Sequence, residues 1–124
     1  MIYEAFFIQE QLDSTLEKDI QNKHITTEFR PKQTHQDLYG KTATFKVIGY
    51  GNDDKNEGFK VEMVSCEDVA LKELFDNIPL PHITLSVSND GKPVNTAKLD
   101  FQPVNGQIVT GKFGGFDNGT VVYK

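Results

Sequence analysis

The sequence has a single cysteine among its 124 residues and no tryptophan. With Cys66 alone, an internal disulfide is excluded, and such low cysteine usage is typical of a reducing compartment. Long hydrophobic runs are also missing, since no segment approaches the roughly 20 apolar residues that a membrane-spanning helix needs. The first residues have no basic flank before their short apolar run, and so predict a strand rather than a signal peptide. We therefore expect a cytoplasmic protein with no membrane partner.

An excess of positive charge is missing as well. The chain has 13 Lys and Arg against 18 Asp and Glu, which gives a formal net charge of -5. Proteins that bind a long duplex usually carry a basic stripe, because neutralisation of phosphates dominates that binding. We therefore exclude long duplex nucleic acid as a partner. A nucleic-acid ligand is expected to be small, namely a nucleotide, a cyclic phosphate or a strand end.

The apolar residues that are present suffice for one domain over residues 1–124. Hydrophobic residues make up 37% of the chain, and nine phenylalanines supply most of the large apolar volume. A chain of this length buries well over half of the surface that its unfolded form exposes. The sequence therefore predicts a single domain with its own core, and we expect it to be a monomer.

Apolar or alternating segments, bounded by turn residues, predict an extensive set of strands. Such segments occur at residues 2–8, 23–30, 42–50, 59–64 and 82–88, and two or three more strands are expected between 98 and 123. Two helices are predicted between them. Leu12, Leu16 and Ile20 recur every four residues and predict a helix over 12–20. The run from Ser65 to Asp68 resembles a capping box, which predicts a helix over about 67–77.

The order strand, helix, strand occurs twice, in residues 2–30 and again in residues 57–88. A repeat of that length suggests a duplicated half, and two such halves would be related by a pseudo-twofold axis. We therefore expect an α+β fold, in which two pseudo-symmetric strand–helix–strand halves form two lobes around a central cleft.

Two of the three histidines open the same tripeptide, in predicted strands of the two halves. The tripeptides are His24-Ile25-Thr26 and His82-Ile83-Thr84. Side chains at positions i and i+2 of a strand point to the same face, so each histidine projects together with its threonine while the isoleucine faces the core. Each half is thus expected to present an imidazole and a hydroxyl to a shared cleft.

A phosphate held between the two strands would accept hydrogen bonds from Thr26 and Thr84, with an imidazole on either side. In-line cleavage of a phosphodiester needs one group to remove a proton and another to donate one. Histidine suits both roles, because its unperturbed pKa of about 6.5 lies near working pH. We therefore predict His24 and His82 as the catalytic pair, with their order open. Ser86, further along the second strand, is predicted as an additional substrate ligand.

The segments KHITTEF and PHITLSV resemble the paired His-x-Thr/Ser motifs of the two-histidine (2H) phosphoesterase superfamily, and the resemblance extends over about residues 1–90. It implies a bilobal α+β fold, His24 and His82 as the acid–base pair, and Thr26 and Thr84 as phosphate ligands. It also implies hydrolysis of a 2′,3′-cyclic phosphate, as in RNA processing, or of a cyclic oligonucleotide, without a metal or other cofactor. Many relatives are longer, and their motifs lie further apart.

The sequence also contains features that would suit other functions. The two motif histidines with Glu28 would imitate a metal triad, but no close-spaced histidine pair accompanies them. The acidic turn at 51–58 lacks the glycine and glutamate positions of a calcium loop. His35 lies in a polar loop and is expected to be solvated. The alternative function is a non-catalytic module on the same fold that binds a nucleotide or an RNA end.

Overall fold

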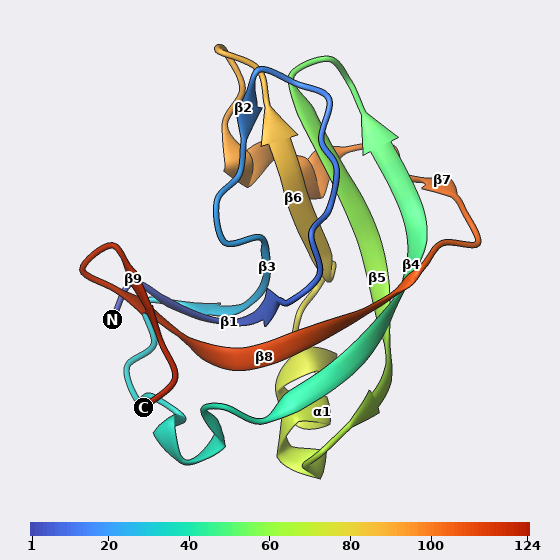
Figure 1. Cartoon of the computed structure of the whole chain (residues 1–124). Helices are drawn as coiled ribbons and strands as arrows, with labels where there is room; N and C mark the ends of the chain where they lie inside the picture. Colours follow the sequence, from blue (N-terminus) through green and yellow to red (C-terminus); the bar gives the residue numbers. More distant parts are fainter.

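The computed structural model describes all 124 residues as one strongly curved antiparallel sheet with a single α-helix (Figure 1). Strands make up 46% of the chain and helices 14%. The strands are β1 (Tyr3–Ile8), β2 (Lys18–Asp19), β3 (His24–Phe29), β4 (Thr42–Asn52), β5 (Asn56–Cys66), β6 (His82–Val87), β7 (Gln102–Pro103), β8 (Ile108–Asp117) and β9 (Thr120–Val122). The helices are α1 (Val69–Asp76) and two short 3-10 helices, η1 (Gln36–Leu38) and η2 (Pro93–Lys98). None of them has the length and apolar character required to cross a membrane.

All five strands predicted from hydrophobic patterning are confirmed, and the last part of the chain forms β7, β8 and β9. The predicted helix over 67–77 is confirmed as α1. Its N-cap is Asp68, whose side chain accepts a hydrogen bond from the amide of Ala70. Such a cap satisfies one of the amide groups that a helix leaves unpaired at its start.

The predicted bilobal α+β fold with two strand–helix–strand halves is wrong, because the structure is mostly antiparallel sheet and the first half has no helix. Residues 12–20 are extended instead, since their amides bond to distant groups rather than within a helix. The amide of Leu16 donates to Ser86 Oγ, and that of Ile20 donates to the carbonyl of Leu85. A four-residue spacing also places side chains on one face of an extended chain, so the pattern did not distinguish the two conformations.

The strand order gives the sheet an internal symmetry. Its order is β2-β6-β5-β4-β8-β1-β3, so the antiparallel pair β4–β8 lies at the centre and the two motif strands, β6 and β3, lie toward its two ends. The sheet curls around its core until β3 and β6 contact each other, although no hydrogen-bonded ladder joins them (Figure 1). The two motif strands therefore occupy matching places in the strand order, although an α-helix precedes only the second of them.

Each motif strand has a β-bulge directly after its threonine. In β3 the residue without a partner is Thr27, next to Thr26, and in β6 it is Leu85, next to Thr84. A bulge sets two residues of one strand against one residue of its neighbour and changes which face the following side chains point to. The two motif strands thus match in sequence and in this irregularity.

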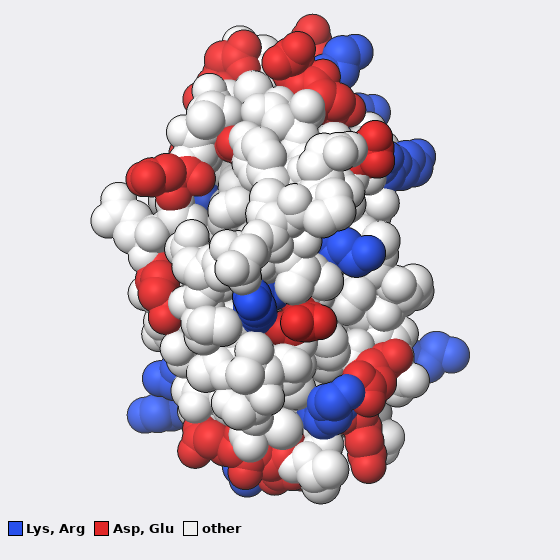
Figure 2. Space-filling view, turned by 90° about the vertical axis from the view of Figure 1, so that its right-hand side faces the viewer, with Lys and Arg blue, Asp and Glu red and all other residues white.

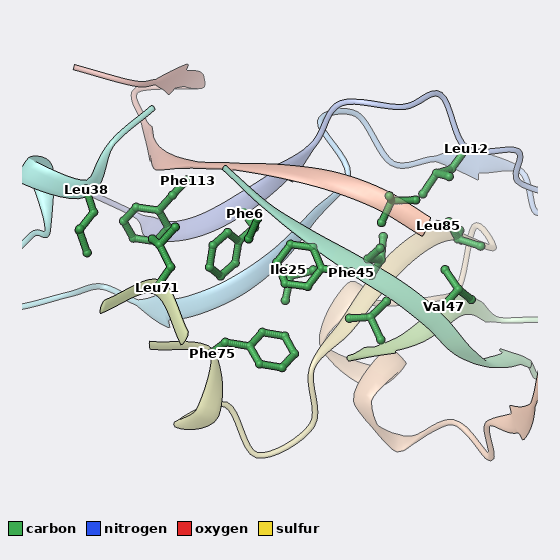
Figure 3. Packing of buried hydrophobic residues seen from close by; sticks show 14 residues of the cluster. Phe6, Leu12, Ile25, Leu38, Phe45, Val47, Leu71, Phe75, Leu85 and Phe113 are labelled. Carbon is green, nitrogen blue, oxygen red and sulfur yellow. The ribbon is translucent and has the colours of Figure 1, made fainter. Parts of the chain in front are cut away.

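The core lies inside the curved sheet and is built on aromatic contacts (Figure 3). Phe6 of β1 packs against Phe45 of β4 and Phe113 of β8, with ring centroids 5.0 and 5.4 Å apart. Phe75 of α1 packs against Phe45 at 5.5 Å, so the helix closes one end of the core. Ile25, the middle residue of the first motif, is fully buried in the same cluster. Its neighbours His24 and Thr26 therefore lie on the other face of β3.

Three glycines on the outer face of β4 and β5 allow the segment 93–103 to lie flat on the sheet. A Cβ on Gly58 would stand 2.5 Å from Thr96 Cγ2, and one on Gly51 would stand 2.9 Å from Leu99 Cβ. Gly49 approaches the same segment further along. The segment, including η2, therefore covers the face of the sheet that carries the second motif threonine.

Glu57 holds the extended loop against the sheet. Its side chain is only 2% exposed, and it accepts hydrogen bonds from the amide and hydroxyl of Thr15, from Ser86 Oγ at 2.7 Å, and from the hydroxyl of Tyr50. Burial raises the pKa of Glu57, but the hydrogen bonds outweigh burial and hold that pKa below its ordinary value of 4.5. The ionised Glu57 carboxylate therefore stabilises the folded state above about pH 4.5, and this stabilisation is lost as the pH falls through the lowered pKa.

We predict that Glu57→Gln lowers the free energy of unfolding by about 2–3 kcal/mol, because an amide leaves buried donors unsatisfied without changing the packed volume. Denaturant unfolding measures this loss, and hydrogen exchange at Thr15 and Leu16 should become faster. The exposed Glu62 of the same strand provides the control, since Glu62→Gln should change stability by less than about 0.5 kcal/mol. Equal effects of the two substitutions would show that Glu57 does not hold the loop.

Candidate functional site

His24 and His82 occupy equivalent positions, each as the first residue of a motif strand. Both are half-buried, and they lie on the two strands that contact each other without forming a ladder. Each has its threonine two residues further along, partly exposed, with a buried isoleucine between them. The structure thus places the two predicted motifs on adjoining strands.

Both imidazoles are held in the same tautomer. Nδ1 of His24 lies 2.9 Å from the carbonyl oxygen of Asn22, and Nδ1 of His82 lies 2.8 Å from that of Leu80. A carbonyl only accepts, so each neutral ring must carry its proton on Nδ1 and its lone pair on Nε2. Asn22 has a positive φ of 54°, a conformation that asparagine tolerates, and Leu80 precedes Pro81, which disfavours a helical backbone there. The local backbone therefore orients both rings.

His24 is packed among aromatic rings. The Tyr3 ring stacks on it with centroids 4.6 Å apart, and the Phe7 ring lies at 5.7 Å. Burial lowers the pKa of His24, the hydrogen bond to Asn22 opposes this, and the charge of His82 lowers the pKa further. The net pKa lies below the ordinary 6.5, so His24 is neutral near pH 7 and its Nε2 can accept a proton.

His82 has a cation beside it instead. Lys60 of β5 is its direct cross-strand partner, which places the two side chains on one face about 5 Å apart at their Cβ atoms. Lys60 forms no ion pair. A Cβ added to Gly49 of β4 would stand 3.0 Å from the Cβ of Lys60. An ammonium group there is suited to an anionic ligand. Sequence reasoning missed Lys60, because only the register of β5 with β6 brings it to the site.

The threonines differ in their contacts. Thr84 Oγ1 donates a hydrogen bond to Thr96 Oγ1 at 3.0 Å, which joins the second motif to η2. Thr26 lies on the first motif strand opposite Ala5, and the neighbouring Thr27 bonds to the carbonyl of Glu4. Hydroxyls both donate and accept, so the pair Thr84–Thr96 can reverse its direction and release a donor for a phosphate oxygen.

The prediction of Ser86 as a substrate ligand is wrong. Ser86 is fully buried, donates to Glu57 and accepts from the amide of Leu16, so its hydroxyl is already used. The bulge at Leu85 explains this, because it places Ser86 opposite Glu57, whose side chain points into the protein. Ser86 is part of the structure that supports the loop.

Glu28 belongs to a different cluster. The ligand atoms of Glu4, Glu28 and His35 lie within 4.8 Å of one another, apart from the motif histidine of the same strand. Glu4 is fully buried and accepts bonds from the amide and Nδ1 of His35, each at 2.7 Å, and from the hydroxyl of Tyr39. Burial and the Glu4 carboxylate raise the pKa of Tyr39. His35 is therefore a structural residue, not the solvated one expected, and Glu28 does not complete a triad with the motif histidines.

No family model, curated protein or solved structure matches this chain.

We predict an NMR titration of His24 with a midpoint below pH 6.5. Tyr3→Ala should move that midpoint upward, because it removes the ring that shields the imidazole from water. His82→Ala should also move it upward, because a neighbouring positive charge is lost. Exposed Phe29, on the same strand, serves as the control, and Phe29→Ala should leave the midpoint in place. A midpoint at or above 6.5 in the wild-type protein would contradict the assignment of His24 as a neutral base.

Proposed function

We propose that this protein is a metal-independent phosphodiesterase that acts on a small nucleotide or an RNA end, with His24 and His82 as its acid–base pair. The substrate class is a 2′,3′-cyclic phosphate or a cyclic oligonucleotide. The observation that carries the proposal is that two histidines on adjoining strands each place Nδ1 within hydrogen-bond distance of a backbone carbonyl oxygen. The resemblance of both motifs to 2H phosphoesterases adds independent support.

The lowered pKa of His24 assigns it the role of base in this proposal, which leaves His82 as the acid. His24 takes a proton through Nε2 from a water that attacks the phosphorus, and His82 gives a proton to the leaving oxygen as the bond between that oxygen and phosphorus breaks. One water is consumed, and a phosphomonoester and a hydroxyl are formed. The proton gained by His24 and the proton lost by His82 return through solvent, which restores the starting state.

Negative charge that develops on the non-bridging oxygens of the phosphate is stabilised best by cations and hydrogen-bond donors that are already in position. Lys60 supplies a cation beside His82, and the hydroxyls of Thr26 and Thr84 supply hydrogen bonds from both motif strands. These groups stabilise the developing charge from the protein itself, so the proposed reaction does not depend on a divalent ion.

We predict that His24→Ala and His82→Ala each lower kcat by about 10²–10⁴-fold on a cleaved substrate, because each removes one proton transfer. A panel of 2′,3′-cyclic mononucleotides and cyclic di- and trinucleotides identifies that substrate. Wild-type turnover should persist in EDTA. His35→Asn is the matched histidine control and should retain the activity of the folded protein.

Activity that survives in both histidine variants would refute the proposal, and so would its loss in EDTA. Ligand binding by the wild-type protein without any turnover would indicate the alternative, a nucleotide-binding module.

We predict a smaller effect for the hydroxyls. Thr26→Ala and Thr84→Ala should each lower kcat by up to about 10²-fold, because each removes one neutral donor to the phosphate. Thr→Ser at either position should restore most of the rate, since serine keeps the hydroxyl. A serine variant as impaired as the alanine variant would show that the methyl group, and therefore packing, is what matters.

A further inference from the structure

A polar cavity of about 440 Å³ lies beyond the other end of β6. It is formed by the turn between β4 and β5, the turn that follows β6, and η2. All eight of its lining residues are polar or glycine. It takes no part in the chemistry assigned to the histidines.

Three lysines line this cavity without any ion pair: Lys55, Lys92 and Lys98. Of the two acidic residues there, Asp53 already accepts hydrogen bonds from the amides of Lys55 and Asn56. Asp90 is the other acid, so the cavity has a local excess of cations within a protein of net charge -5. At the upper end of the view in Figure 2, the end that carries the β4–β5 turn in Figure 1, Lys or Arg side chains occur among the acidic ones.

The cavity is connected to the second motif through hydrogen bonds. Thr84 donates to Thr96, and Asn56, which lines the cavity, donates from Nδ2 to both Thr96 Oγ1 and the carbonyl of Lys92. Thr84 lies on the same face of β6 as His82, so these hydrogen bonds link the cavity to the face that carries the second motif. Ser88 lies six positions along the chain from His82, which corresponds to about 20 Å in a strand.

A buried polar group beside the cavity has no partner. The hydroxyl of Ser88 is buried without a hydrogen bond, while its backbone bonds to Lys55 and Gly91, both of which line the cavity. Buried hydroxyls are almost always hydrogen-bonded, so this unpaired one, next in sequence to the turn that lines the cavity, is a site for an ordered water.

We propose that this cavity binds a second phosphate of the substrate, so that the protein acts on the end of a linear oligonucleotide in preference to a cyclic mononucleotide. This inference rests on the proposed function for the reacting phosphate. A span of about 20 Å corresponds to roughly three to six nucleotides, given about 3.4 Å per stacked nucleotide and up to twice that when extended. Lysine ammonium groups bind phosphates as point charges, as this arrangement requires.

The anion site can be tested without turnover. We expect millimolar inorganic phosphate to shift the amide NMR signals of Lys55, Gly91 and Lys92 saturably, and the shifts should vanish when Lys55, Lys92 and Lys98 are all changed to glutamine. The control changes Lys32, Lys72 and Lys124 to glutamine, which alters net charge equally outside the cavity and should keep the shifts. Absence of saturable shifts in the wild-type protein, or their loss in the control, would overturn the site.

The link to the substrate is tested by kinetics. For the wild-type protein, KM for a short oligonucleotide that ends in a 2′,3′-cyclic phosphate should be at least about tenfold below KM for the cyclic mononucleotide. Changing the three cavity lysines to glutamine should bring the ratio of the two KM values close to one. The same change should weaken the dependence of the oligonucleotide KM on salt concentration. A ratio that is near one in the wild-type protein, or unchanged in the variant, would refute the inference. If no substrate is turned over, the proposed function fails, while the phosphate titration still decides the anion site.

Discussion

The pairing of β4 with β8 is the contact on which the rest of this structure depends. It joins segments that are far apart in the sequence, with Thr42 opposite Lys112 and Lys46 opposite Ile108. Every other strand of the curved sheet attaches outward from this pair, so the sheet connects the two motif strands only through it. Non-local pairing of this kind makes folding slow, because a long loop must close before the contact stabilises it. The geometry of the histidines is thus set by a distant part of the sheet.

Two buried carboxylates hold the connections of this sheet in place. Glu4 and Glu57 lie opposite the residues that follow the two bulges, and each accepts a bond from a tyrosine and fixes a loop. Burying a charge is unfavourable unless several donors surround it, and both glutamates have three or more. Hydrogen bonding to carboxylates therefore replaces the packing of amphipathic helices as the means of holding the connections in place.

The sequence predicted the parts of the structure that local patterns determine. The alternating strands were found because a half-buried strand shows its period in any short window, and the histidine motifs because the same tripeptide occurs twice. The region around Leu16 was misread, since a spacing of four is common to a helix and an extended chain. Ser86 was misplaced by a bulge, and Lys60 was overlooked because strand register is non-local. His35 was misjudged because nothing in a polar loop reveals that it bonds to a buried acid.

The three glycines under the segment 93–103 have a consequence for how this surface tolerates change. A methyl group at Gly51 or Gly58 would displace that segment from the sheet, since a Cβ there would stand 2.9 Å or less from its atoms, and at Gly49 the contact with Phe101 would be tight at 3.1 Å. The same displacement would carry Lys92 and Lys98 away from β6 and separate Thr96 from its partner. The shape and charge of this surface are thus encoded partly by the absence of side chains, at positions that never contact a ligand themselves.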